Sequence, residues 1–391
     1  MSKDINMIFF RLLRSAIDSH PLTDEERAEY STEQFSKFFS IAKKHDVAHL
    51  LILGLKKNGL LTGESAAYEK LILKTALRYE RQNYELEKLC SALEEAKIPF
   101  IPLKGSVIRK YYPEPWMRTS CDIDVLVHKE DMSRAIECLS TKLDYEEDGR
   151  STHDISLFSP SNIRLELHFD LVEEGCANNA AETLNYVWDN ASPSSNHLYL
   201  HELSDSFFYF YHIAHMAKHF EYGGCGIRPF LDLWLLDSIE SEDKKELYKH
   251  IDKANLTRFA DAVRALSEVW FGNGTHNEVS RKMQEYIISG GVYGTSENRV
   301  AILQKKKGGK IGYIISRIFV PSAKLKRYYP ILDKYPILMP FMQVRRWFML
   351  ANPKIALMAK NELKANQNLD KTSTDEMKKF MDDIGLHGRA S

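Results

Sequence analysis

The chain has 391 residues, of which 44% are hydrophobic and 27% are charged, and its formal net charge is −1. These values fit a globular protein with a sizeable core, divided into two or three compact units. They exclude a chain that is attracted to nucleic acid by its overall charge. The five cysteines are scattered and include no C-x-x-C pair, which favours reduced thiols in a cytoplasmic protein over a zinc site.

Residues 1–97 are expected to form an N-terminal helical region. The apolar stretch within residues 1–17 is too short to span a membrane and has no small-residue cleavage site, so it predicts an amphipathic helix rather than a signal sequence. Ser31 and Gln34 have the spacing of a capping box, and a long helix is expected over residues 65–97. The region has few convergent polar residues, which indicates a supporting role.

The apolar periodicity changes over residues 98–175, which predicts a small unit of strands and short helices. We expect strands at residues 98–103, 121–127, 154–158 and 163–171, and helices at residues 105–112 and 130–142. The whole chain therefore reads as an α+β fold, in which a small mixed sheet is flanked by N-terminal and C-terminal helical regions.

The second half of the chain is expected to be helical. Residues 176–275 predict a helical domain, with helices at residues 206–220 and 229–238. Residues 276–391 predict a C-terminal helical region, and the polar composition after about Ala365 indicates a mobile or loosely helical tail.

Asp122 and Asp124 are the first candidate site residues. Side chains at i and i+2 of a strand point to the same face, so the two carboxylates would lie side by side. Neighbouring carboxylates repel each other unless a cation lies between them, and Mg²⁺ or Mn²⁺ prefers such oxygen ligands. Taken alone, Asp-x-Asp favours the alternative interpretation, an ordinary edge strand with solvated acids.

A basic turn precedes this pair of acids. Gly105 and Ser106 follow an expected strand and open a helix, so their backbone N–H groups could bind an anion. Lys104 and Arg118 would add positive charge, and Arg118 could bind phosphate oxygens through two hydrogen bonds. The alternative for both basic residues is ion pairing with nearby acids.

A third carboxylate is expected from Glu166 on a neighbouring strand. Leu165 and Leu167 would face the core, so Glu166 and His168 would share the opposite face with the other acids. For His168, a structural hydrogen bond to one of these acids is an equally strong interpretation.

The expected helix at residues 206–220 offers a second set of polar residues. His212, His215 and His219 have the spacing i, i+3 and i+7 and share one helical face, with Lys218 beside them. We favour contacts with an acceptor substrate or its phosphate, or plain hydrogen bonds, over zinc. Further along the chain, Asp232 is placed either to pair with Arg228 across one helical turn or to contact the substrate.

Residues 305–350 mix basic and aromatic side chains, and three interpretations remain open. They are a solvated helical face, a weak contact with a membrane surface, and an RNA contact, which the neutral overall charge disfavours. The residues concerned are Lys305 to Lys307, Arg317, Lys324, Lys326, Arg327, Tyr328, Tyr329, Arg345, Arg346 and Trp347.

Three of these segments together resemble the signature of the DNA polymerase β-like nucleotidyltransferase superfamily. They are the Gly105-Ser106 turn, the acid-x-acid strand Asp122-Ile123-Asp124, and the later acid in Leu165-Glu166-Leu167. With Lys104, Arg118 and His168 included, the pattern is similar to a little-characterised bacterial nucleotidyltransferase family. The resemblance is strongest over residues 98–172 and extends more weakly to the residues around His215 and Asp232.

This resemblance implies metal-dependent transfer of a nucleoside monophosphate from a nucleoside triphosphate, such as ATP, with release of pyrophosphate. It implies that Asp122 and Asp124 hold the metals, that Glu166 completes one metal site and helps to deprotonate an acceptor hydroxyl, and that Gly105 and Ser106 bind the β- and γ-phosphates. We expect a small molecule, a sugar or a modified peptide as acceptor. Transfer to a protein or to tRNA, a non-catalytic nucleotide-binding regulator, and a peripheral membrane adaptor are the alternatives.

Overall fold

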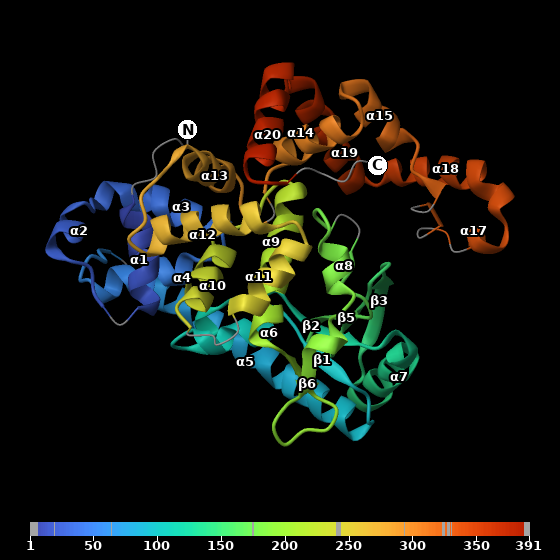
Figure 1. Ribbon diagram of the computed structural model, residues 1–391, viewed down its shortest axis with the longest axis horizontal. Coiled ribbons are helices and arrows are strands. Elements are labelled where there is room, and N and C mark those ends of the chain that lie inside the picture. The colour runs from blue at the N-terminus through green and yellow to red at the C-terminus, as the bar shows by residue number, and fades with distance from the viewer. Residues whose placement is uncertain are drawn as a thin grey trace.

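The computed structural model describes residues 7–18, 20–63, 65–173, 176–239, 244–292, 294–322, 325–326, 329 and 331–386. Over these residues the protein is mainly helical and contains one five-stranded mixed sheet, which confirms the expected α+β fold (Figure 1). None of the helices in the described ranges combines the length and the apolar character that crossing a membrane requires.

Helices precede the sheet, as expected. They are α1 (Ile8–Ile17), α2 (Asp24–Ala28), α3 (Phe35–Lys44), α4 (Ala48–Lys57) and α5 (Ser65–Glu95). The predicted capping box is confirmed: Ser31 and Gln34 cap the 3₁₀ turn Thr32–Gln34, which leads directly into α3. Helix α1 buries its apolar face, including Phe9 and Phe10, in the main hydrophobic core.

The sheet has the strand order β1-β2-β5-β4-β3. Its strands are β1 (Phe100–Pro102), β2 (Asp122–Val127), β3 (Glu146–Arg150), β4 (Asp154–Phe158) and β5 (Arg164–His168). Helix α6 (Gly105–Ile108) follows β1, and α7 (Met132–Leu143) follows β2; short 3₁₀ turns lie at Arg109–Tyr111, Pro115–Met117 and Lys129–Asp131. Strands β2 and β5 are parallel neighbours, and the other pairs are antiparallel.

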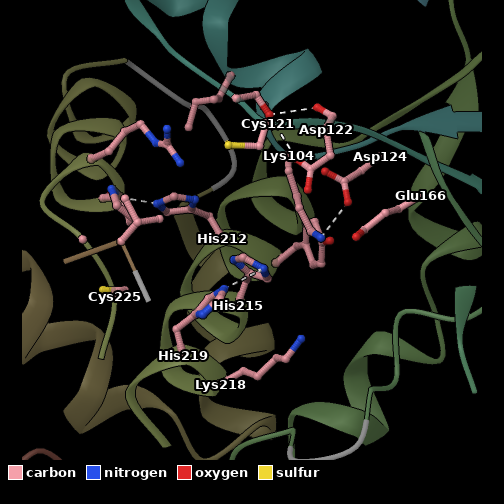
Figure 2. Close-up of a pocket in the computed structure, with 18 of the residues that line it drawn as sticks. Lys104, Cys121, Asp122, Asp124, Glu166, His212, His215, Lys218, His219 and Cys225 are labelled. Carbon is pink, nitrogen blue, oxygen red and sulfur yellow. Dashed lines mark hydrogen bonds and ion pairs between the residues drawn. The ribbon is translucent and has the colours of Figure 1, made fainter. Parts of the chain in front are cut away.

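The two faces of the sheet differ in polarity because side chains alternate along each strand. Ile123 and Val125 of β2 and Leu165 and Leu167 of β5 are buried in a hydrophobic cluster that also contains residues of α5 and α7. The opposite face carries the acids of β2 and β5 and is covered by α9 (Asp205–Glu221) (Figure 2).

Strand β3 is absent from the sequence-based prediction. Its sequence, Glu-Glu-Asp-Gly-Arg, has no apolar alternation, and most of its residues are exposed because it lies at the edge of the sheet. An edge strand with polar residues on both faces has no hydrophobic periodicity to detect. Its pairing with β4 is what defines it as a strand.

The region after residue 176 is not entirely helical, contrary to expectation. A small hairpin of β6 (Ala191–Pro193) and β7 (His201–Leu203) follows α8 (Ala180–Leu184) and the 3₁₀ turn Trp188–Asn190. The remaining elements are helices α9, α10 (Arg228–Asp237), α11 (Lys244–Lys253), α12 (Thr257–Phe271) and α13 (Glu278–Ser289). Helices α9 and α10 match the two predicted helices to within a residue at each end.

The C-terminal region contains α14 (Ser296–Lys306), α15 (Lys310–Ile318), α17 (Ile331–Lys334), α18 (Met339–Trp347), α19 (Pro353–Asn368) and α20 (Lys371–Asp383), with 3₁₀ turns at Pro336–Leu338 and Phe348–Ala351. The expectation of a loosely helical tail is wrong for α20. Phe380, Met381 and Ile384 are buried in the main core, and the Asn178 side-chain amide donates a hydrogen bond of 2.8 Å to the Gly385 carbonyl. A few apolar residues at helical spacing are therefore enough to pack α20 against the core, although most of its residues are polar.

Candidate active site

Strands β2 and β5 bring the predicted acids together. Their parallel register places Asp124 opposite Glu166 and Leu126 opposite His168. Asp122, Asp124, Glu166 and His168 therefore lie on the same face of the sheet, and all four line one cavity of about 380 Å³. The sequence predicted the shared face, and the structure supplies the adjacency of the two strands.

The turn before α6 has an unusual backbone conformation at Lys104. Its φ of 45° and ψ of −117° resemble the first central position of a type II′ turn, which normally favours glycine. The Ser106 N–H donates to the Leu103 carbonyl, which closes this turn, and the Leu103 N–H donates to the Asp124 carbonyl. The turn is thus attached directly to β2, and the strained conformation holds the Lys104 side chain beside the acids.

Lys104 and His168 both contact the same carboxylate. Lys104 Nζ lies 2.8 Å from Asp124 Oδ1, and His168 Nε2 lies 3.0 Å from the same oxygen. The Asp124 side chain is only 3% exposed. Burial opposes ionisation, but the Lys104 ammonium and the His168 hydrogen bond outweigh it and hold the pKa of Asp124 well below its usual range.

The pKa values of the other two acids, Asp122 and Glu166, shift in the opposite direction. Burial and the nearby Asp124 carboxylate raise the pKa of Asp122, and the same two causes raise the pKa of Glu166. Glu166 contacts Arg164 at 3.1 Å, and the Ser120 hydroxyl donates to Asp122 Oδ1 at 3.2 Å. Burial and repulsion from Asp124 thus both oppose the ionisation of these two acids.

Arg118 forms the alternative contact that the sequence left open, an ion pair with an acid. Its Nε and Nη2 atoms donate to the two carboxylate oxygens of Asp232 at 3.2 and 2.8 Å, and the Tyr112 hydroxyl donates to the same carboxylate at 2.8 Å. Asp232 is fully buried. Gly105 makes room for this contact, because a Cβ at that position would lie 2.9 Å from Arg118 Nη1 and 3.0 Å from Ser120 Oγ.

Arg228 does not pair with Asp232, contrary to one of the two expectations. Its Nη1 atom contacts Asp46 at 3.1 Å and donates to the Thr119 hydroxyl at 2.8 Å. The one-turn spacing of Arg228 and Asp232 permitted a local pair, but tertiary packing offers each of them a partner from a distant segment. Arg228 nevertheless lines the cavity, whereas Asp232 and Ser106 are not among the described residues that line it.

Helix α9 forms the wall opposite the acids (Figure 2). His212, His215, Lys218 and His219 all line the cavity. The Nε2 atoms of His215 and His219 lie 3.2 Å apart, and His212 Nε2 lies 2.9 Å from the Pro229 carbonyl oxygen. Burial lowers the pKa of all three histidines, to about 4 for His219, so this wall presents neutral imidazoles at pH 7.

A second polar group in the cavity was missed by the sequence reasoning. His153 Nε2 lies 2.8 Å from Asp154 and 3.1 Å from Glu173, and Lys218 also contacts Glu173. Although burial opposes protonation, Asp154 and Glu173 raise the pKa of His153 to about 9. The only local signal was a His-Asp dipeptide at the start of an expected strand, and its position beside β5 depends on the sheet topology.

The donor groups fit a divalent cation. Oxygen or nitrogen atoms of Asp124, Glu166 and His168 lie within 4.8 Å of one another, as do those of His153, Asp154 and His168. Asp122 belongs to neither group, although its carboxylate faces the same cavity. The two carboxylates of the first group are suitable ligands for Mg²⁺ or Mn²⁺.

Comparison with known proteins indicates which family the chain belongs to. The model of a family described as uncharacterised nucleotidyltransferase matches residues 31–272, which are more than half of the chain. The matched span contains β1 to β5, α9 and α10, and so every predicted site residue. No curated protein matches the chain. The chain therefore belongs to this nucleotidyltransferase family and is a nucleotidyltransferase.

Proposed function

We propose that this enzyme is an Mg²⁺-dependent (or Mn²⁺-dependent) cytoplasmic nucleotidyltransferase that moves a nucleoside monophosphate from a nucleoside triphosphate to a hydroxyl or phosphate of a small molecule, sugar or modified peptide. One observation carries the proposal: Asp122, Asp124 and Glu166 line the same cavity as Lys104. The resemblance of this arrangement to the DNA polymerase β-like superfamily adds support. The cytoplasmic location is supported by five free cysteines.

In the proposed reaction, an acceptor oxygen forms a bond to the α-phosphorus while the bond from this phosphorus to the pyrophosphate oxygen breaks. A hydroxyl acceptor must also lose a proton. Glu166 would help to accept it, because its carboxylate lines the cavity beside Asp124. A phosphate acceptor is already ionised and would need no such base.

Asp124 and Glu166, with Asp122 beside them, would hold the divalent cation, which would neutralise charge on the phosphates. Lys104 would stabilise the negative charge that the pyrophosphate gains. Its Nζ atom lies in the cavity beside Asp124, so a short side-chain movement would place it on a phosphate oxygen. Arg118 would act indirectly, because its guanidinium is occupied by Asp232 and positions the turn at Gly105.

The cavity favours a small acceptor. About 380 Å³ lies within the range of small-molecule sites, and the wall of α9 offers neutral imidazoles that hydrogen-bond hydroxyl groups. His215 and His219, with Lys218 and Arg228 nearby, would contact the acceptor. A protein side chain or the end of a tRNA could also enter, so acceptor identity needs a direct experiment.

The test is incubation of the purified protein with each α-labelled nucleoside triphosphate, Mg²⁺ and a cell extract. We expect label on a small molecule, and label on protein or RNA would identify the alternative acceptors. The Asp122→Asn/Asp124→Asn double variant should lose turnover while its circular dichroism spectrum stays native. Asp148→Asn, an exposed acid of the same sheet, is the matched control and should remain active.

Turnover that persists in the double variant would refute the assignment of these acids. Binding of nucleotide without any transfer, in the wild-type protein and with every triphosphate, would instead favour a non-catalytic regulator.

A further inference from the structure

The charges of the chain are strongly segregated. Residues 305–360 contain thirteen lysines and arginines but a single acid, Asp333, although the whole chain has a net charge of −1. The remainder of the chain is therefore clearly acidic. A cationic segment on an otherwise acidic protein is suited to an anionic partner that approaches from one side only.

The same segment exposes an unusual share of apolar side chains. Of the twenty-two large hydrophobic residues that are exposed within the described part of the chain, fourteen lie between Ile311 and Met358. Scattered single apolar residues on a surface need no explanation, but a concentration of them marks an interaction site.

Helix α15 has its apolar residues on two faces. Tyr313 points inward and is fully buried in a small cluster with Val300 and Ala365. Ile311, Ile315 and Ile318 have the spacing i, i+4 and i+7 and are all exposed, Ile311 to 74%. A helix that already has a buried face thus presents a second apolar stripe to solvent.

Helix α18 has the same character and contains no buried residue. Phe341, Val344 and Phe348 have the spacing i, i+3 and i+7, and Phe341 and Phe348 are 70% and 74% exposed. Hydrogen bonds from the Arg346 guanidinium and the Trp347 indole N–H to the Ile318 carbonyl attach α18 to the end of α15. Polar contacts to backbone position this helix, and its apolar face remains uncovered.

These helices lie apart from the five-stranded sheet (Figure 1). None of their described residues lines the cavity. We call the exposed faces of α15, α17 and α18, over residues 310–348, the basic–apolar face. Lys310, Lys334 and Arg345 are exposed on these helices. Lys324, Arg327 and Tyr328, which the sequence also placed in the basic segment, lie outside the described residues.

We propose that the basic–apolar face binds an anionic lipid bilayer, with its apolar stripes in the headgroup region and its basic residues against the lipid phosphates. Charge complementarity and exposed isoleucine and phenylalanine side chains both fit this partner. A second copy of the chain fits less well because two cationic faces repel each other. RNA fits less well because the isoleucine stripe of α15 cannot stack on bases, so only part of the exposed apolar surface would be used.

The test is co-sedimentation of the full chain with vesicles of phosphatidylcholine containing about one third phosphatidylglycerol. We expect binding that falls at least about tenfold on pure phosphatidylcholine vesicles and falls steeply when salt is raised from about 0.1 M to 1 M. The Phe341→Ser/Phe348→Ser variant should lose binding by about tenfold or more. Leu198→Ser, which removes an equally exposed side chain from the β6–β7 hairpin, should bind like the wild type.

The proposal is overturned if the protein does not sediment with anionic vesicles, or if Leu198→Ser lowers binding as much as the double variant does. It is also overturned if single-stranded RNA abolishes vesicle binding and itself binds more tightly than the vesicles, or if light scattering shows a stable oligomer that the Phe341→Ser/Phe348→Ser variant dissociates. Nucleotidyl transfer is measured in solution without vesicles. Failure of the membrane proposal and failure of the proposed enzyme activity can therefore be told apart.

Discussion

Lys104 combines a strained backbone conformation with a charge contact in the cavity. The residue adopts a positive φ that costs a non-glycine residue about 1–3 kcal/mol, and its ammonium reaches the most deeply buried acid of the cavity. A glycine would relieve the backbone but would remove the charge. The turn therefore combines a strained backbone at Lys104 with an ion pair between this side chain and Asp124.

Replacement of Lys104 by methionine tests this role. Lys104→Met keeps the length of the side chain but leaves Asp124 with His168 as its remaining partner, so we expect a loss of stability of about 3 kcal/mol in urea unfolding. Transfer activity should fall by at least about 100-fold. Adding Asp124→Asn should restore part of the stability, because the buried carboxylate that has lost its ammonium partner is then removed. Lys110→Met, at an exposed position nearby, is the control and should change neither quantity.

Gly105 offers a second test at the residue scale. A Cβ there would collide with the guanidinium of Arg118, which cannot move away because Asp232 holds it. We expect Gly105→Ala to lower the free energy of unfolding by about 1–3 kcal/mol, as overpacking does. Gly149→Ala is the control, since a Cβ at Gly149 would meet no atom within 4 Å. Equal stability of the two variants would contradict the close packing at Gly105.

At the scale of elements, a buried ion pair and a side-chain hydrogen bond attach the segment before β2 to the helical part of the chain. Arg118, just before β2, pairs with Asp232 of α10, and Arg228 at the start of α10 contacts Asp46 and Thr119. These contacts determine how α10, and α9 beside it, face the acids of β2 and β5. The two walls of the cavity come from different segments, and their separation depends on such pairs.

Asp232→Asn should therefore affect both stability and activity without touching the substrate. The variant leaves Arg118 buried without an anionic partner, and we expect a loss of about 3–5 kcal/mol in urea unfolding. In wild-type protein, Arg118 positions the turn at Gly105. Displacement of Arg118 in the variant should therefore raise KM for the triphosphate more than it lowers kcat, as measured on the molecules that remain folded. An unchanged KM would show that this pair does not position the turn.

At the scale of the whole molecule, buried neutral histidines predict sensitivity to acid. Burial lowers the pKa of His45, His49 and His219 to about 4, from the ordinary value of 6.5. The unfolded chain therefore binds more protons than the folded protein between these two pH values, and stability is lost as the pH falls from 6.5 to about 4. Each histidine contributes at most about 3 kcal/mol to this loss.

His49→Gln should reduce this pH dependence. The glutamine amide can still donate to the Met117 carbonyl, 2.7 Å from His49 Nε2, but it does not titrate. We expect urea unfolding curves to show a smaller decrease in stability from pH 6.5 to 4 than in the wild type. Parallel decreases in the two proteins would mean that His49 is protonated in the folded state.

The sequence by itself determined the local features of this protein. Alternation along a strand places Asp122 with Asp124, and Glu166 with His168, on one face whatever the rest of the chain does. Helical spacing likewise places His212, His215 and His219 on one side of α9. These periodicities were sufficient for the fold class and for most of the helices and strands, because each depends only on neighbouring residues.

Only the tertiary structure decided which of these features meet. The parallel pairing of β2 with β5, the pairing of Arg118 with Asp232, and the contact of Lys218 with Glu173 join residues far apart in the chain. No periodicity encodes such contacts, because a buried charge takes whichever partner the packing of distant elements brings within reach. The same reason explains why β3 and the buried face of α20 were not predicted.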